Sequence, residues 1–188
     1  MVNQVIQDVV ERLKNGAPTS VVVTEPGRGA VSFTSELVKY IKASNNLTSL
    51  LPISIKCSNI DCDEIGYWKA VYNGIWKVLQ PYCANNRDTL ELYAKGIETS
   101  DNMLKISKIL GRFLITTNNS TNIRVLLILE DFDSMVYKLE EPAIMILRGI
   151  TPLITVLTIS NKTLEELGLE RYGNAYYCNQ FTPPPFYI

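Results

Sequence analysis

A Gly-rich turn between an apolar strand and an amphipathic helix gives this chain a candidate phosphate-binding loop. Gly27, Arg28 and Gly29 follow the apolar residues 21–23 and precede Ser32. Such a layout aims backbone N–H groups and the N-terminus of a helix at an anion, and a hydroxyl placed like that of Ser32 can bind Mg²⁺. We therefore take Gly27, Arg28, Gly29 and Ser32 as the candidate phosphate-binding residues.

The same loop lacks the group that matters most for phosphate. In the pattern G-x-x-x-x-G-K-[ST], Glu25 and Ala30 stand in place of the two glycines and Val31 in place of the lysine. The lysine charge meets the β- and γ-phosphates, whereas a carboxylate at Glu25 repels them. Arg28 has two possible roles. It could bind phosphate in place of the lysine, or it could pair with Glu25, so that the protein's own carboxylate occupies the anion site. We favour the internal pair.

Polar residues also follow two strongly apolar segments farther along the chain. Glu130 and Asp131 follow the first segment, and Ser160 and Asn161 follow the second. The carboxyl ends of parallel strands meet at one edge of a sheet, where ligands bind. If the chain is active, Ser32, Glu130 and Asp131 could hold Mg²⁺. The alternatives are a solvated acidic turn and ordinary turn residues.

Strand-like segments alternate with amphipathic helical segments, which predicts a single α/β domain over residues 1–188. The alternation is typical of a parallel sheet with helices on both faces, in three layers. We expect five strands, and we expect the most continuously apolar of them to be adjacent and central. The expected strands begin near Ser20, Leu51, Arg124, Ile154 and Ala175, and the first, third and fourth of these are the most apolar.

The helices between these strands are predicted from apolar periodicity and capping residues. Residues 84–102 are the most polar stretch, so we expect a short helix and loops there. Ser100 or Asp101 is the expected N-cap of the next helix, residues 103–114. A further helix is expected over residues 141–148.

Composition restricts the classes of function. The chain has 188 residues, 46% apolar and 20% charged, with a net charge of −1, so it has no broadly basic surface for nucleic acid. No apolar run approaches the roughly 18 to 20 residues of a membrane span, and we expect a cytoplasmic protein. Four cysteines without a histidine predict reduced thiols and no metal site, and they exclude His-dependent catalytic triads.

Taken in order, these motifs resemble the P-loop NTPases that carry an extra strand between their two nucleotide-binding motifs. The AAA+ and STAND ATPases are similar, especially the origin-recognition and initiator branch. The resemblance implies that Glu130 and Asp131 order Mg²⁺ and water, and that Ser160 and Asn161 sense the γ-phosphate. It also implies that Arg171 is an arginine finger for a neighbouring subunit, although an exposed surface arginine fits the charges around it better.

Two further departures from this family bear on activity. The acids read Glu130-Asp131 where the family usually has Asp-Glu, which changes the reach of each carboxylate. Proteins of this family continue into a helical lid after the fifth strand. Because this sequence ends at Ile188, we expect no lid. Residues 181–188 form an apolar, Pro-rich tail that either covers an edge of its own sheet or docks on a partner.

These observations predict a non-catalytic, AAA+-like pseudo-ATPase rather than an enzyme. It would act as a subunit or adaptor in a larger assembly, which the initiator likeness suggests is DNA-associated. We expect no cofactor, a protein partner in a homo- or hetero-oligomer, nucleic acid only indirectly and no membrane. The alternative is a weak ATP-binding ATPase or switch that uses ATP and Mg²⁺ and is completed by a neighbouring subunit.

Overall fold

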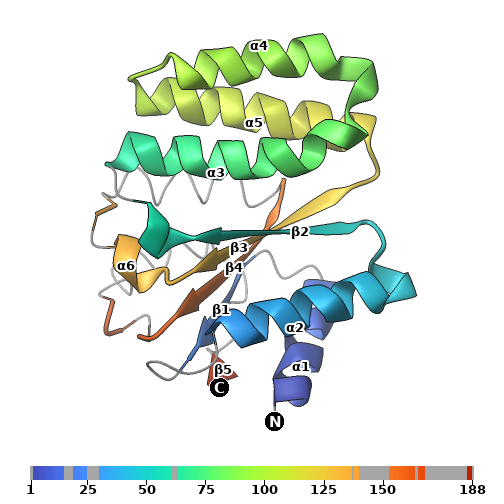
Figure 1. The fold of residues 1–188 in the computed structure, drawn as a ribbon, viewed down its shortest axis with the longest axis vertical. Helices are drawn as coiled ribbons and strands as arrows, with labels where there is room; N and C mark the ends of the chain where they lie inside the picture. Colours follow the sequence, from blue (N-terminus) through green and yellow to red (C-terminus); the bar gives the residue numbers. More distant parts are fainter. Residues whose placement is uncertain are drawn as a thin grey trace.

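A parallel sheet with helices on both faces organises the molecule (Figure 1). The computed structural model describes residues 2–14, 19–24, 30–60, 63–136, 138–139, 153–163, 165–167 and 186–187. The helices are α1 (Val2–Lys14), α2 (Ala30–Ala43), α3 (Glu64–Leu79), α4 (Arg87–Glu98), α5 (Met103–Ser120) and α6 (Asp133–Val136). The strands are β1 (Thr19–Val23), β2 (Leu50–Lys56), β3 (Arg124–Glu130), β4 (Thr155–Ser160) and β5 (Phe186–Tyr187).

The strands lie in the order β2-β3-β4-β1-β5, and every pairing is parallel. The three strands expected to be adjacent and central are β3, β4 and β1, and this prediction is confirmed. The sequence predicts five strands. Among the described residues four strands are five or more residues long, and the fifth, β5, is a pairing of only two residues beside β1. The predicted strand near Ala175 lies outside the described residues, as does the predicted helix over residues 141–148.

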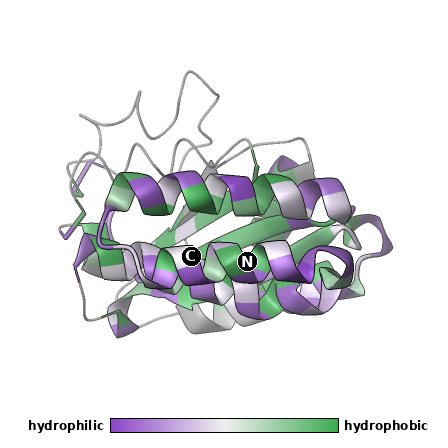
Figure 2. Ribbon diagram, turned by 90° about the horizontal axis from the view of Figure 1, so that it is seen from above, coloured by the Kyte–Doolittle hydropathy of each residue, from purple (hydrophilic) through white to green (hydrophobic). Residues whose placement is uncertain are grey.

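Side chains of β3 alternate between two cores, because successive residues of a strand point to opposite faces. Val125, Leu127 and Leu129 pack with α3, α4 and α5, whereas Leu126 and Ile128 pack with α1 and α2. All five side chains are at most 1% exposed. In Figure 2 the strands are almost wholly hydrophobic, whereas the helices alternate hydrophobic and hydrophilic segments. This gives the three layers expected for an α/β fold.

Two helical predictions need correction. Residues 87–98 form the full helix α4 instead of a short helix with loops, because Leu90 and Ile97 give it an apolar face that packs on α5. The N-cap of α5 is Asn102, whose side chain accepts a hydrogen bond from Lys105 N–H at 3.0 Å, rather than Ser100 or Asp101. The Ser100 hydroxyl is buried and bonds to Asn102 instead. No helix of the described residues is long and apolar enough to cross a membrane.

The contact between α3 and β2 is tight at a glycine. A Cβ added to Gly74 would lie 2.9 Å from Cδ1 and 3.2 Å from Cγ1 of Ile55, closer than ordinary van der Waals contact. Gly111 in α5 is different, because a Cβ there would meet nothing within 4 Å. An alanine at Gly111 would change only the helix propensity, whereas an alanine at Gly74 would also crowd Ile55.

Replacing each glycine with alanine tests this packing. Gly111→Ala should raise the free energy of unfolding by about 0.5–1 kcal/mol, because alanine loses less backbone entropy in a helix. Gly74→Ala should gain less or destabilise, because Ile55 must move to make room. Urea denaturation of the two variants and the wild type measures the difference. Equal gains at both positions would contradict the close approach of α3 to β2.

Candidate functional site

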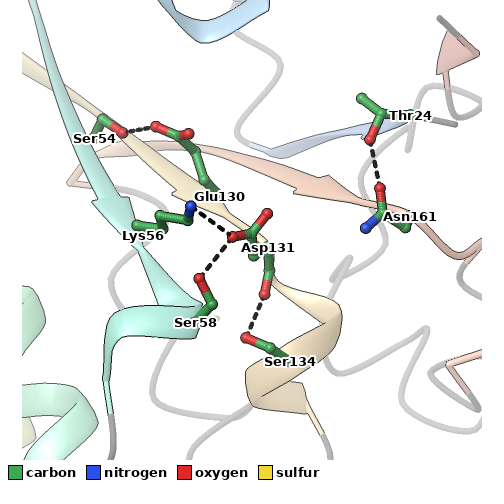
Figure 3. A network of polar contacts seen from close by, with 8 residues as sticks. All are labelled: Thr24, Ser54, Lys56, Ser58, Glu130, Asp131, Ser134 and Asn161. Atoms are coloured by element: carbon green, nitrogen blue, oxygen red, sulfur yellow. Dashed lines mark hydrogen bonds and ion pairs between the residues drawn. The ribbon is translucent and has the colours of Figure 1, made fainter. Parts of the chain in front are cut away.

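The polar residues predicted to follow the strands do meet at the carboxyl edge of the sheet, but in two separate groups (Figure 3). One group joins Glu130 and Asp131, at the end of β3, to residues of β2 and the turn after it. The other joins Thr24, after β1, to Asn161, after β4. Each group has its own hydrogen bonds.

Glu130 is the last residue of β3 and is 8% exposed. It continues the even-numbered positions of the strand, Leu126 and Ile128, so it lies on the face of the sheet that α1 and α2 cover. Its carboxylate accepts a hydrogen bond from the hydroxyl of Ser54 on the neighbouring strand β2. One oxygen of the buried carboxylate is thus occupied within the protein.

Asp131 adopts a left-handed backbone conformation, with φ of 51°. Its carboxylate accepts a hydrogen bond from the Ser58 hydroxyl at 2.7 Å and lies 3.6 Å from the ammonium of Lys56. Its backbone carbonyl accepts hydrogen bonds from Ser134, from Oγ at 2.7 Å and from N–H at 3.0 Å. Asp is one of the few residue types that adopt this conformation readily, because its short side chain can hydrogen-bond nearby. These contacts turn the carboxylate toward the end of β2.

Asn161 joins the turns that follow three strands. Its Oδ1 accepts a hydrogen bond from the Thr24 hydroxyl at 2.9 Å, and its N–H donates to Asp133 Oδ1 at 3.2 Å. Ser160 is 2% exposed; its carbonyl accepts from Thr24 N–H at 2.9 Å, and its hydroxyl accepts from Lys162 N–H at 3.0 Å. Both candidate sensor residues therefore bind neighbouring turns of the chain itself.

The acids at this edge of the sheet affect the pKa of the nearby Cys57. Burial, together with the nearby carboxylates of Asp131, Glu130 and Asp133, raises the pKa of its thiol to about 12. A thiol with so high a pKa is protonated at neutral pH and is therefore a poor nucleophile. Among the described residues, no group of three or more cysteine, aspartate and glutamate side chains is placed to hold a metal ion.

The remaining predicted site residues are only partly covered by the structure. Glu25, Gly27, Arg28, Gly29 and Arg171 lie outside the described residues. The backbone of Ala30, Val31 and Ser32 forms the first turn of α2, and nothing is described of their side chains.

Sequence reasoning missed the residues of β2 and its turn that bind the two acids. Ser54 and Lys56 alternate along β2, and Lys56 stands opposite Glu130 in the register of the two strands. The alternation of polar residues at the end of an apolar strand was a visible signal. No signal in the sequence indicates the register of β2 and β3, because it depends on the pairing of two strands that lie about 70 residues apart in the chain.

Solved structures with a similar fold include two of the ORC2 protein of Aeropyrum pernix. Its complexes with ADPNP and ADP match with a TM-score of 0.63 and 13% identity, over 100% of this chain and 46% of that chain. Its ADP form matches with a TM-score of 0.61 and 14% identity, over 98% and 46%. A Walker-type ATPase of Pyrococcus abyssi matches with a TM-score of 0.60 and 8% identity, over 97% and 51%.

These likenesses show the fold alone: an α/β domain with a parallel sheet, like that of the ORC2 protein and of the Walker-type ATPase. In the sheet β4 lies between β1 and β3, the strands that precede the candidate phosphate loop and the acids Glu130 and Asp131. The chain spans about half the length of the solved chains it matches. The sequence matches no protein-family model and no curated protein.

The left-handed backbone at Asp131 can be tested by two substitutions that remove the same carboxylate. Asp131→Ala should be less stable than Asp131→Gly by about 1 kcal/mol, because a left-handed residue with a Cβ costs roughly 1–2 kcal/mol and the greater freedom of glycine in the unfolded state offsets part of this. Urea denaturation at neutral pH measures both. A glycine variant less stable than the alanine variant would contradict the left-handed conformation in solution.

Proposed function

We propose that this domain is a non-catalytic, AAA+-like ATPase fold that serves as a subunit or adaptor in a larger assembly. The observation that carries the proposal is the engagement of both acids by β2. Asp131 is turned toward Lys56 and Ser58, and Glu130 accepts from Ser54. In an ATPase of this fold, these positions would need free carboxylate oxygens for Mg²⁺ and for the attacking water.

The phosphate loop supports the same proposal from its sequence. Val31 replaces the lysine that would meet the β- and γ-phosphates, and Glu25 adds negative charge beside their path. A charge-assisted hydrogen bond to phosphate contributes about 1.5–3 kcal/mol, so its loss alone lowers affinity by one to two orders of magnitude. The ORC2 protein was solved with ADPNP and ADP; we infer that this chain has kept that fold and lost the affinity.

A domain of this fold without phosphate chemistry can still recognise other proteins. We infer a protein partner in a homo- or hetero-oligomer, with any nucleic acid reached through that partner. Exposed apolar side chains on α4 and α5, which include Leu92, Leu104 and Ile115, support a docking role.

A second candidate function is a weak ATP-dependent switch completed by a neighbouring subunit. One observation favours it: Glu130 lies on the same face of the sheet as α2, whose first turn contains Ser32. This is the arrangement that a Mg²⁺ ion shared by Ser32 and Glu130 would need. Because one oxygen of Glu130 accepts from Ser54, only the other would be left for the metal, which lowers the net affinity.

Nucleotide titration distinguishes the two candidates. Isothermal calorimetry with ATP and ADP, with and without Mg²⁺, should show no binding tighter than about 100 μM, because the attractive charge is missing and a repulsive one is present. A low-micromolar dissociation constant for Mg-ATP would overturn the non-catalytic proposal and favour the switch.

Restoring the motif should restore affinity. In Glu25→Gly with Val31→Lys, the repulsive carboxylate is removed and the phosphate-binding charge is returned, so affinity for Mg-ATP should rise about tenfold or more. The matched control is Glu25→Gly with Val31→Gln, which has a polar side chain of similar length without the charge. Equal affinities of the two folded variants would mean that the loop does not have phosphate-binding geometry.

A further inference from the structure

Helix α5 carries an unbalanced positive charge. Its 18 residues, MLKISKILGRFLITTNNS, include three basic residues and no acidic one. Lys105, Lys108 and Arg112 are all exposed, and no salt bridge among the described residues involves them. The whole chain has a net charge of −1, so these cations are concentrated locally rather than typical of the surface.

One of these cations occupies a position that works against helix stability. Asn102 is the N-cap of α5, which makes Lys105 the third residue of the first turn. The N-terminus of a helix has a partial positive charge, so acids stabilise the first turn and a lysine destabilises it. The side chain of Asn102 caps this end of the helix, but the lysine charge itself is placed against the helix dipole, and such breaks of a local rule are expected at functional sites.

Exposed apolar side chains lie among the cations. Leu104 is 62% exposed and Ile115 is 48% exposed. On a helix, residues 104, 108, 111 and 115 fall on one face, opposite the buried Ile106 and Phe113. The outward face of α5 therefore places an apolar residue near each end and Lys108 between them, with Lys105 and Arg112 alongside. We call these five residues, Leu104, Lys105, Lys108, Arg112 and Ile115, the α5 face.

We propose that the α5 face binds an acidic amphipathic helix of a partner protein. This deepens the proposed function, on which it rests, by naming the chemistry of the partner. Residues 104–115 span about 16 Å, or three helical turns, at 1.5 Å per residue. The matching segment would carry carboxylates on the borders of an apolar stripe of about three turns, so that its acids meet the three cations and its apolar residues cover Leu104 and Ile115.

The mixture of charge and apolar surface favours a protein over a nucleic acid. A phosphate backbone would pair with the lysines and the arginine but would leave Leu104 and Ile115 in contact with charged groups and water. Binding through three phosphate contacts would also be weak at physiological salt. A partner with both acids and apolar side chains satisfies every member of the α5 face.

The position of α5 makes it available for such a partner. Together α4 and α5 form a hairpin beside α3 at one end of the molecule, away from α1 and α2 (Figure 1). The edge that carries Glu130 and Asp131 is formed by the carboxyl ends of the strands. Because α5 packs on α3 and α3 packs on β2, a helix bound to the outward side of α5 would be separated from the sheet by α3.

A designed peptide tests the proposal on the full chain. The probe is a fluorescein-labelled acidic amphipathic helix of about 18 residues, with leucines on one stripe and glutamates on its borders, and its scrambled sequence is the control peptide. By fluorescence anisotropy at low salt, the designed peptide should bind with a micromolar dissociation constant, and the scrambled peptide should bind at least about fivefold more weakly, because it lacks the apolar stripe.

Charge-reversal variants locate the binding face. Lys105→Glu with Lys108→Glu and Arg112→Glu should weaken binding of the designed peptide by about tenfold or more. Lys39→Glu with Lys42→Glu changes two exposed lysines of α2, on the other face of the sheet, and should leave the affinity unchanged. Leu104→Ser with Ile115→Ser should weaken binding by about threefold or more, because the partner no longer buries apolar surface.

A single substitution separates a binding role from a structural one. Lys105→Glu places an acid in the first turn of α5, so it should raise the unfolding temperature by one or more degrees. The same substitution should weaken peptide binding. A variant that gains stability and keeps its full affinity would show that Lys105 has no role in docking and would overturn the proposal.

Other outcomes would also overturn it. Tighter binding of a 20-base-pair DNA duplex than of the peptide, lost in the triple charge reversal, would assign the α5 face to nucleic acid. Self-association in sedimentation experiments, lost in the same variant, would assign it to a second copy of the chain. If neither the peptide nor ATP binds, the docking proposal is wrong, whereas the proposal of a non-catalytic domain still holds.

Discussion

The burial of β3 on both faces is the constraint on which the rest of this structure depends. A strand that is apolar at five successive positions is stable only if helices cover both sides of the sheet, so α3, α4 and α5 must pack on one face and α1 and α2 on the other. Parallel neighbours on both edges of β3 then fix where the strand ends. That end is where the chain changes from apolar residues to Glu130 and Asp131.

The consequence for the site is that strand register, rather than local sequence, decides what the acids contact. Lys56 stands opposite Glu130, and Ser58 follows in the next turn, so β2 provides a cation and hydroxyls at the point where the carboxylates emerge. The left-handed backbone of Asp131 turns its side chain to these groups. An acid pair that has its partners inside the domain has less capacity left for Mg²⁺ or water, and this connects the packing of the sheet to the proposed loss of catalysis.

The carboxyl edge of the sheet and the exposed face of α5 differ in how well their charges are compensated. At the carboxyl edge of the sheet, carboxylates meet Lys56, serine hydroxyls and backbone N–H groups. On α5, three cations and two apolar side chains face solvent without such partners among the described residues. Acids that are bonded within the domain and a helix face that is exposed together support the proposed recognition role.

The sequence by itself determined the α/β class, the adjacency of β1, β3 and β4 and the positions of most helices, because burial in a two-sided sheet is written as apolar periodicity. It also shows that Val31 stands where the P-loop pattern has its lysine. It misjudged α4, whose polar composition hides an apolar face of few residues, Leu90 and Ile97 among them. Only the tertiary structure decided that Ser54, Lys56 and Ser58 bind the acids, because strand register depends on contacts between residues far apart in the chain, and no local pattern encodes it.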